Sequence, residues 1–221
     1  MLKKNKTLIK DIDENQSAAI KAAAKIFYEG GTFIYPTDTI YGLGANPFNN
    51  DAMTKLSKIK ERPVNKQYIM LIGDLESLMR YVNFANELHL DFLRKIWPNP
   101  VSVVLTLNEY YQSILNAKTV AFRIPDNTFC RKLLDEINMP LVSTSANRAN
   151  EEPVNEYNDL IQKYKYEVDA IFYTKKGIMP VSSTLIDLSS DHLFLVREGK
   201  MKFKYLTKQF DSIVNKISTE D

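Results

Sequence analysis

Short apolar segments alternate with helical patterns along most of this chain. Strands are predicted at residues 32–35, 68–72, 101–107, 120–124, 141–143, 170–173, 184–188 and 193–196. Helices are predicted at residues 16–28, 51–60, 75–82, 87–97, 128–137 and 157–167. The alternation predicts an α/β fold. Because the last three strands follow one another without a helix, we expect a mixed sheet rather than a purely parallel one.

The composition fits one globular domain. Of the 221 residues, 44% are hydrophobic and 25% are charged, which is enough for a core without disulfides. We expect one domain over residues 1–205 and a charged tail over 206–221, either helical or frayed. Cys130 is the only cysteine and there are two histidines, so no Cys/His zinc cluster is expected. No apolar run approaches the roughly 20 residues of a membrane span, so a cytoplasmic protein without membrane contact is expected.

Residues 35–44 read Tyr-Pro-Thr-Asp-Thr-Ile-Tyr-Gly-Leu-Gly. Two threonines and an aspartate follow the end of a strand, and two glycines follow them. The glycines permit a close backbone turn that would present donors to a small ligand. A turn stabilised by Thr or Asp side chains explains the same residues, and both interpretations stay open.

Residues 58–63 read Lys-Ile-Lys-Glu-Arg-Pro at the end of a predicted helix, with Asp51 as the candidate cap at its start. Pro63 disfavours the helical conformation of Arg62, so the helix is expected to end near Glu61. Lys60 and Arg62 would then converge at an exposed helix end, where two cations suit a polyphosphate. A solvated basic helix end is the alternative.

Residues 141–148, Leu-Val-Ser-Thr-Ser-Ala-Asn-Arg, place three hydroxyls and an amide after an apolar strand. This arrangement is as typical of a ligand-binding strand end as of a turn. Arg123 lies between apolar neighbours, so we expect its partner to be either a ligand anion or a carboxylate of the protein itself. The sequence contains neither a P-loop nor a Gly-x-Ser-x-Gly nucleophile motif.

In this order, the segments resemble the YrdC-like family of threonylcarbamoyl-adenylate synthases. The most specific match is residues 35–44. Further matches are Lys60-x-Arg62-Pro63, Ser145-x-Asn147, Ser183-Thr184 and Arg197 before Glu198-Gly199. Residues 97–102 are similar to the family's Trp-Pro-Gly-Pro-Val-Thr. The resemblance covers about residues 15–200, as in the single-domain members, and five ordered motifs are more specific than any one.

The resemblance implies a twisted mixed sheet with flanking helices around a concave basic cavity. It implies that L-threonine, bicarbonate or CO₂, and ATP give threonylcarbamoyl-AMP and pyrophosphate. A partner enzyme then transfers the threonylcarbamoyl group to the adenosine beside the anticodon of tRNA. Mg²⁺ is expected to arrive with ATP, and no tightly bound organic cofactor is expected.

The site residues follow from the same resemblance. It implies Lys60 and Arg62 as the catalytic cations. The residues implied to bind threonine are Thr39, Arg123, Ser145 and Ser183. Those implied to bind ATP are Lys60, Arg62, Thr119, Asn147, Asn155 and Arg197.

An RNA-binding module of the same fold without synthase activity is the alternative. Its basic surface would be formed by Lys55, Lys58, Lys60, Arg62 and Lys66. The net charge of only +2 favours a small-molecule pocket, while direct contact with tRNA stays open. A carbamoyl-phosphate-using domain of a hydrogenase-maturation factor is disfavoured, because such modules belong to longer chains with cysteine clusters.

Overall fold

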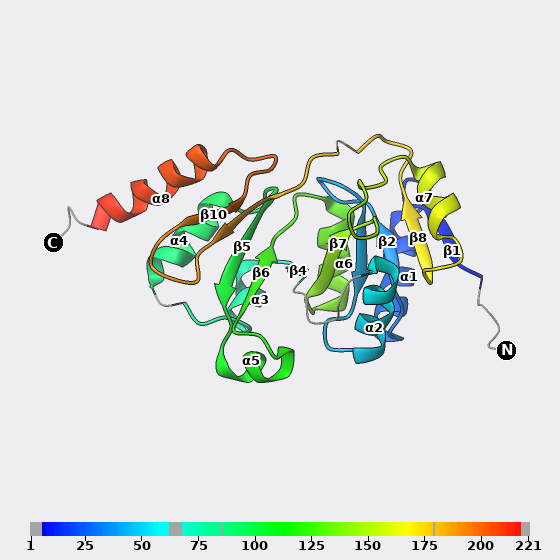
Figure 1. The fold of residues 1–221 in the computed structure, drawn as a ribbon, viewed down its shortest axis with the longest axis horizontal. Coiled ribbons are helices and arrows are strands. Elements are labelled where there is room, and N and C mark those ends of the chain that lie inside the picture. The colour runs from blue at the N-terminus through cyan, green and yellow to red at the C-terminus, as the bar shows by residue number, and fades with distance from the viewer. Residues whose placement is uncertain (1–5, 62–67, 85, 179, 218–221) are drawn as a thin grey trace.

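The computed structural model describes residues 6–61, 68–84, 86–178 and 180–217 (Figure 1). Within them, ten strands form one sheet in the order β1-β8-β2-β3-β7-β4-β6-β5-β9-β10. The strands are β1 (Leu8–Asp11), β2 (Phe33–Tyr35), β3 (Gly42–Ala45), β4 (Ile69–Leu71), β5 (Val101–Thr106), β6 (Thr119–Arg123), β7 (Leu141–Ser145), β8 (Ala170–Tyr173), β9 (Thr184–Asp187) and β10 (Phe194–Arg197). The helices are α1 (Gln16–Tyr28), α2 (Asn50–Lys60), α3 (Leu75–Met79), α4 (Glu87–Ile96), α5 (Glu109–Leu115), α6 (Thr128–Ile137), α7 (Tyr157–Tyr164) and α8 (Phe203–Ile217).

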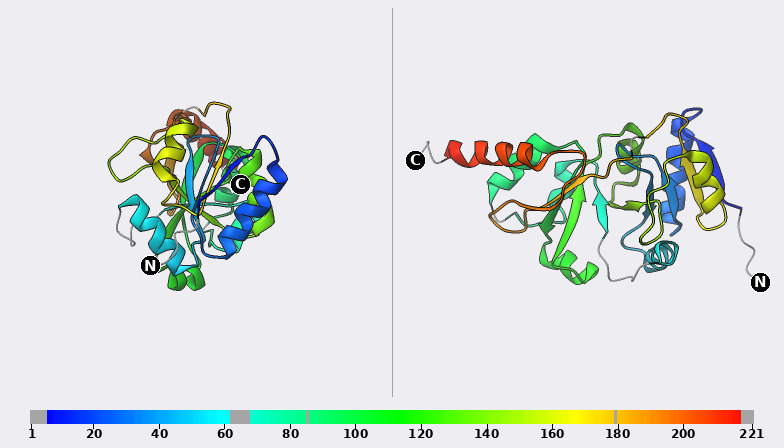
Figure 2. Two further views of the ribbon diagram at one scale, coloured as in Figure 1. Left: turned by 90° about the vertical axis from the view of Figure 1, so that its right-hand side faces the viewer. Right: turned by 45° about the horizontal axis from the view of Figure 1, so that its top comes forward.

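The sheet is twisted and mixed, as predicted. Strands β1, β8 and β2 run parallel, whereas β3 is antiparallel to both β2 and β7. Figure 1 shows the sheet extending along the long axis of the molecule, with β1 near one end and α8 near the other. Seen along that axis in Figure 2, α1 and α2 lie on opposite sides of the sheet.

Apolar side chains that alternate along β2 pack against the helices on the two faces of the sheet. Phe33 and Tyr35 of β2 pack in the cluster that includes α1 and α6, whereas Ile34 packs in the cluster with α2 and α7. A third cluster joins β5, β6 and β9 to α3, α4 and α8. Because successive strand residues point to opposite faces, burying both faces of β2 explains its continuous apolar sequence.

Helix ends follow from local side chains. Gly30, with a φ of 72°, follows α1, and an added Cβ there would lie 2.7 Å from Asn49 Nδ2. The predicted cap of α2 at Asp51 is wrong, because Asn49 Oδ1 accepts the hydrogen bond from the Ala52 amide at 2.9 Å. The helix ends at Glu61, which adopts the left-handed conformation with a φ of 51°.

Helix α8 packs on the domain rather than standing apart from it. Leu206 and Ile213 are buried, and the Phe210 ring meets that of Phe92 of α4 edge-on, with 5.3 Å between centroids. The boundary predicted after residue 205 falls within this helix, and the division into domain and tail stays a prediction. None of the helices in the described ranges is long and apolar enough to cross a membrane.

Candidate functional site

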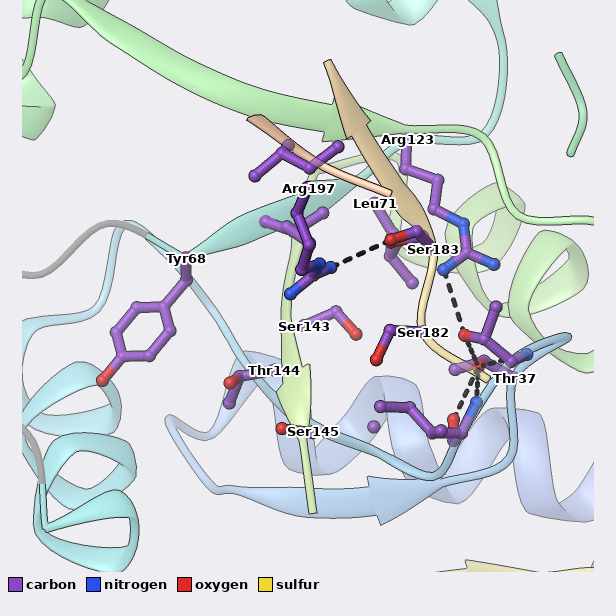
Figure 3. A pocket seen from close by; sticks show the side chains of 15 residues that line it. Thr37, Tyr68, Leu71, Arg123, Ser143, Thr144, Ser145, Ser182, Ser183 and Arg197 are labelled. Carbon is purple, nitrogen blue, oxygen red and sulfur yellow. Dashed lines mark hydrogen bonds between the residues drawn. The ribbon is translucent and has the colours of Figure 1, made fainter. Parts of the chain in front are cut away.

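A cavity of about 260 Å³ lies on one face of the sheet. Its lining comes from segments spread over most of the chain and brings together most of the hydroxyl-bearing residues singled out above. The lining residues are Thr37, Thr39, Ile40, Gly42, Tyr68, Ile69, Leu71, Arg123, Ser143, Thr144, Ser145, Ser182, Ser183, Leu185 and Arg197. Figure 3 shows Ser143, Ser182 and Arg197 pointing into the same space, while the Tyr68 ring points away from it.

Strand register explains why these residues meet. Gly42 of β3 is opposite Ser145 of β7, and Ser143, two residues earlier, is opposite Ile69 of β4. On the other side, Leu71 of β4 is opposite Arg123 of β6. Residues that are paired across strands share a face, so the cavity surface is one continuous face of the central strands. The intervening residues, such as Met70, Val142 and Phe122, are buried on the opposite face.

The cavity is cationic and rich in hydroxyls. Arg123 and Arg197 are its two cations, and no carboxylate occurs among the described residues that line it. Leu71 and Leu185 supply an apolar part of the wall. The volume lies below the roughly 300 Å³ at which drug-sized pockets begin. The cavity therefore suits a small anion that also carries a hydroxyl and an apolar group.

The Arg123 guanidinium is buried and engaged from the turn that follows β2. It forms an ion pair with Asp38 through Nη2, and Nη1 donates a hydrogen bond to Thr39 Oγ1 at 3.2 Å. Thr37 Oγ1 accepts from the amides of Thr39 and Ile40, at 3.1 and 3.2 Å, and so closes the turn. The segment is therefore a side-chain-stabilised turn, and Thr37 and Thr39 line the cavity; that it presents donors to a ligand stays a prediction.

The two glycines of this motif do not form the predicted backbone turn. Gly42 and Gly44 lie within strand β3 and have no positive φ. An added Cβ at Gly44 would lie 2.8 Å from Tyr35 Cε1, and one at Gly42 would lie 3.0 Å from Tyr35 Cζ. The glycines are therefore needed because the buried Tyr35 ring packs across β3 on the cavity face.

Arg197 and Gly199 form hydrogen bonds with the start of β9 and the residue before it. Arg197 Nη2 donates to the Ser183 carbonyl at 3.0 Å, and partial desolvation lowers the pKa of the guanidinium below its ordinary value, although the residue as a whole is exposed. The Gly199 amide donates to Thr184 Oγ1 at 3.0 Å. An added Cβ at Gly199 would lie 2.3 Å from the Ser182 carbonyl oxygen, so only glycine fits there. Ser183 Oγ in turn lies 3.0 Å from Ser102 Oγ.

Lys60 is buried, contrary to the predicted exposed helix end, and does not line the cavity. The end of α2 packs beside the end of β7, and the ammonium donates to three oxygens there. These are the carbonyl oxygens of Ser145 and Asn147, at 2.8 and 2.5 Å, and Asn147 Oδ1, at 2.7 Å. Lys60 thus holds the strand end that carries Ser145, a residue of the cavity.

The other residues assigned to ATP are more dispersed. Asn147 Oδ1 also accepts from Ser145 Oγ, so Asn147 adjoins the cavity without lining it. Thr119 shares the cavity face of β6 with Arg123 but lies at the opposite end of that strand. Asn155 donates to the Pro153 carbonyl at 3.0 Å and is not part of the lining. Arg62 lies outside the described residues, and its role stays a prediction.

The basic surface proposed for RNA binding is only partly exposed. Lys60 is buried and engaged, and Lys55 Nζ donates to the Gly30 carbonyl at 3.2 Å. Lys58 is exposed, whereas Arg62 and Lys66 lie outside the described residues. Lys55 and Lys58 are both exposed, and of the cations of this set in the described ranges only the Lys58 side chain has no internal hydrogen bond or ion pair.

Sequence reasoning missed several residues of the cavity. It placed the end of β7 at Ser143, whereas the strand continues to Ser145, so that Ser143 and Ser145 point to the same face. Their spacing of two was the available signal. Thr37 and Ser182 adjoin residues that were named, but Leu71 and Leu185 resemble ordinary core residues in the sequence.

Comparison with known proteins identifies the family. The family model Sua5_yciO_yrdC, described as "Telomere recombination", matches residues 25–199. The structure of P. abyssi Sua5 complexed with L-threonine is 26% identical, with a TM-score of 0.80 over 92% of this chain and 59% of that one. A second P. abyssi Sua5 structure, of a double variant, is 26% identical, with a TM-score of 0.81 over 91% of this chain.

This chain spans 63% of the length of that second Sua5 chain. E. coli YciO is closer in length: it is 25% identical, with a TM-score of 0.78 over 90% of this chain and 96% of that one. The family match covers most of the chain, and its cavity-lining motifs lie within the matched residues. The chain therefore belongs to the Sua5/YciO/YrdC family.

Proposed function

We propose that this protein is an L-threonylcarbamoyl-adenylate synthase, which forms threonylcarbamoyl-AMP and pyrophosphate from L-threonine, bicarbonate or CO₂, and ATP. The observation that carries the proposal is that Thr39, Arg123, Ser145 and Ser183 all line one cavity. These are the four residues that the family resemblance assigns to threonine. The complex of P. abyssi Sua5 with L-threonine supports the same substrate.

The cavity chemistry matches an amino acid with a hydroxyl and a methyl group. Arg123 would bind the α-carboxylate, since its planar fork suits a carboxylate. Hydroxyls such as Ser143 and Ser145 would meet the polar groups of threonine. Leu71 and Leu185 would contact the methyl group. One methyl contributes only about 1–3 kcal/mol, so threonine should be preferred over serine by about tenfold to a couple of hundredfold.

The reaction needs positioning and charge neutralisation rather than a protein nucleophile. The threonine amine adds to CO₂ with loss of a proton, or condenses with bicarbonate with loss of water, to give a carbamate. A carbamate oxygen then attacks the α-phosphorus of ATP, and pyrophosphate leaves. Arg197 would stabilise the charge on the phosphates, together with Arg62 and the Asn147 strand end that Lys60 holds. We assign Mg²⁺ to the incoming triphosphate, because Mg²⁺ in nucleotide sites is held largely by the phosphates and by water.

Pyrophosphate release tests the proposal. We expect release from ATP only when threonine and bicarbonate are both present, and a loss of about two to three orders of magnitude in Arg123→Gln. Arg131→Gln, at an exposed position of α6, is the matched control and should retain activity. Release that does not depend on threonine, or no release at all, would refute the synthase assignment. Binding of RNA by such an inactive protein would favour the RNA-binding alternative.

The product points to a following transfer step. Threonylcarbamoyl-AMP is an activated acyl donor, so we propose that a partner enzyme in the cytoplasm transfers its threonylcarbamoyl group to the adenosine beside the anticodon of tRNA. Addition of the purified protein to such a transferase, with tRNA, threonine, bicarbonate and ATP, should yield the modified nucleoside.

A further inference from the structure

The ion pair between Asp38 and Arg123 lies between two cavities. Arg123 lines the site, whereas Asp38 lines a neighbouring cavity of about 390 Å³ on the other side of the turn after β2. Both side chains are at least nine-tenths buried, with exposed fractions of 9% for Asp38 and 6% for Arg123. The carboxylate therefore contacts the guanidinium from outside the substrate cavity.

The turn that carries Asp38 is held on both sides. Lys200 Nζ donates to the Asp38 carbonyl at 3.1 Å, and the Cys130 thiol lies 3.4 Å from the Pro36 carbonyl oxygen. Figure 3 shows the Arg123 guanidinium turned toward the Thr37 end of this turn. These contacts fix the position of the Asp38 carboxylate, and the Arg123 guanidinium forms its ion pair with it.

Two buried atoms of this pair have no hydrogen-bond partner among the described residues: Asp38 Oδ2 and Arg123 Nε. An ion pair optimised for stability would satisfy both edges, because an unsatisfied buried polar group is destabilising. Proteins break such local rules mainly at functional sites, so incomplete pairing beside the cavity favours a role in holding the guanidinium for a ligand over a purely stabilising role. Arg197 supplies a second cation to the cavity, so neutralisation of Arg123 by Asp38 does not remove its attraction for an anion.

We propose that Asp38 is a positioning residue that acts only through Arg123, fixing the guanidinium so that it receives the α-carboxylate of the amino-acid substrate. The proposal rests on the assignment of the cavity to threonine. It contrasts with a purely structural ion pair, in which loss of Asp38 would lower stability and leave threonine affinity unchanged. It also contrasts with a competing carboxylate, whose removal would strengthen threonine binding.

Calorimetric titration with L-threonine distinguishes these cases. Asp38→Asn retains the shape and one oxygen acceptor but removes the charge, and we expect its Kd for threonine to rise about tenfold or more, as for loss of a charged hydrogen-bond partner. The KM for threonine in pyrophosphate release should rise in parallel, with kcat changed less than KM. Asp13→Asn is the matched control, because Asp13 lines the same neighbouring cavity and contacts Thr174 and Lys176 instead of Arg123.

A double-mutant cycle tests whether Asp38 acts through Arg123. In the Arg123→Gln background, Asp38→Asn should cause no further loss of threonine affinity, since the group that it positions is absent. An additional loss in that background, unchanged affinity of Asp38→Asn, or tighter binding would each overturn the proposal. If the unsubstituted protein binds no threonine, the assignment of the substrate fails first and the positioning role fails with it. Normal binding that Asp38→Asn leaves unchanged refutes the positioning role alone.

Discussion

Replacement of Lys60 by methionine should destabilise the whole fold. Methionine keeps most of the apolar stem but removes the ammonium, which donates to two backbone carbonyl oxygens and to Asn147 Oδ1. A hydrogen bond from a charged group contributes about 1.5–3 kcal/mol. Because the three bonds share one donor group, they do not add fully, and we expect a total loss of about 3 kcal/mol.

For a chain of this size, each 1 kcal/mol lowers Tm by about 2–4 °C, so the Lys60→Met protein should melt about 6–12 °C lower. Lys58→Met, two residues earlier on the exposed side of α2, is the matched control and should melt like the unsubstituted protein. Differential scanning calorimetry is the measurement. Melting of the two variants within 1 °C of each other would refute the structural role deduced for Lys60. A loss of synthase activity in Lys60→Met would then be attributed to a direct phosphate contact instead.

Three further outcomes follow from the packing. Gly44→Ala should lower the free energy of unfolding by about 1–3 kcal/mol, because the new Cβ would lie 2.8 Å from the Tyr35 ring. Gly177→Ala is the control and should change it little, because nothing lies within 4 Å of a Cβ there. Equal urea midpoints for the two variants would contradict this. Burial lowers the pKa of His89 from 6.5, so its protons bind preferentially to the unfolded chain, and stability should fall as pH decreases below about 6.5. That slope should weaken in His89→Leu, as measured by urea unfolding between pH 5.5 and 7.5. Burial also raises the pKa of the Cys130 thiol, so iodoacetamide should modify it only after unfolding, and rapid modification of the folded protein would oppose the buried position.

Elements with strong local signals were predicted from the sequence to the residue. Helix α1 begins after the cap Asn15 and ends before Gly30. Helix α6 has a clear apolar face and lies between the two capping residues Asn127 and Asn138. Strands β1 and β3 were missed for different reasons, a distant partner for β1 and a weak local strand signal for β3. β1 pairs with β8, and β3 contains two glycines, which have low strand propensity, and is stabilised by β2 and β7.

In the candidate site, too, local motifs predicted which residues take part but not the contacts between distant segments. Motif resemblance identified Arg123 and Ser145, and both line the cavity. A carboxylate partner for Arg123 was one of the two expectations, but the sequence did not reveal that it is Asp38, nor the burial of Lys60 beside β7. These contacts join segments more than 80 residues apart, and their geometry follows from sheet register and helix packing, which local patterns do not specify.

The position of β8 between β1 and β2 has a consequence for synthesis of the chain on the ribosome. β8 pairs with β1 on one side and with β2 on the other, yet it is translated long after both. At about 5–20 residues per second, the two early strands wait on the order of ten seconds for it. During that time their open edges resemble the unpaired strands that promote aggregation. Binding of a chaperone to the nascent chain should therefore begin with these strands and end when residues 170–173 leave the exit tunnel.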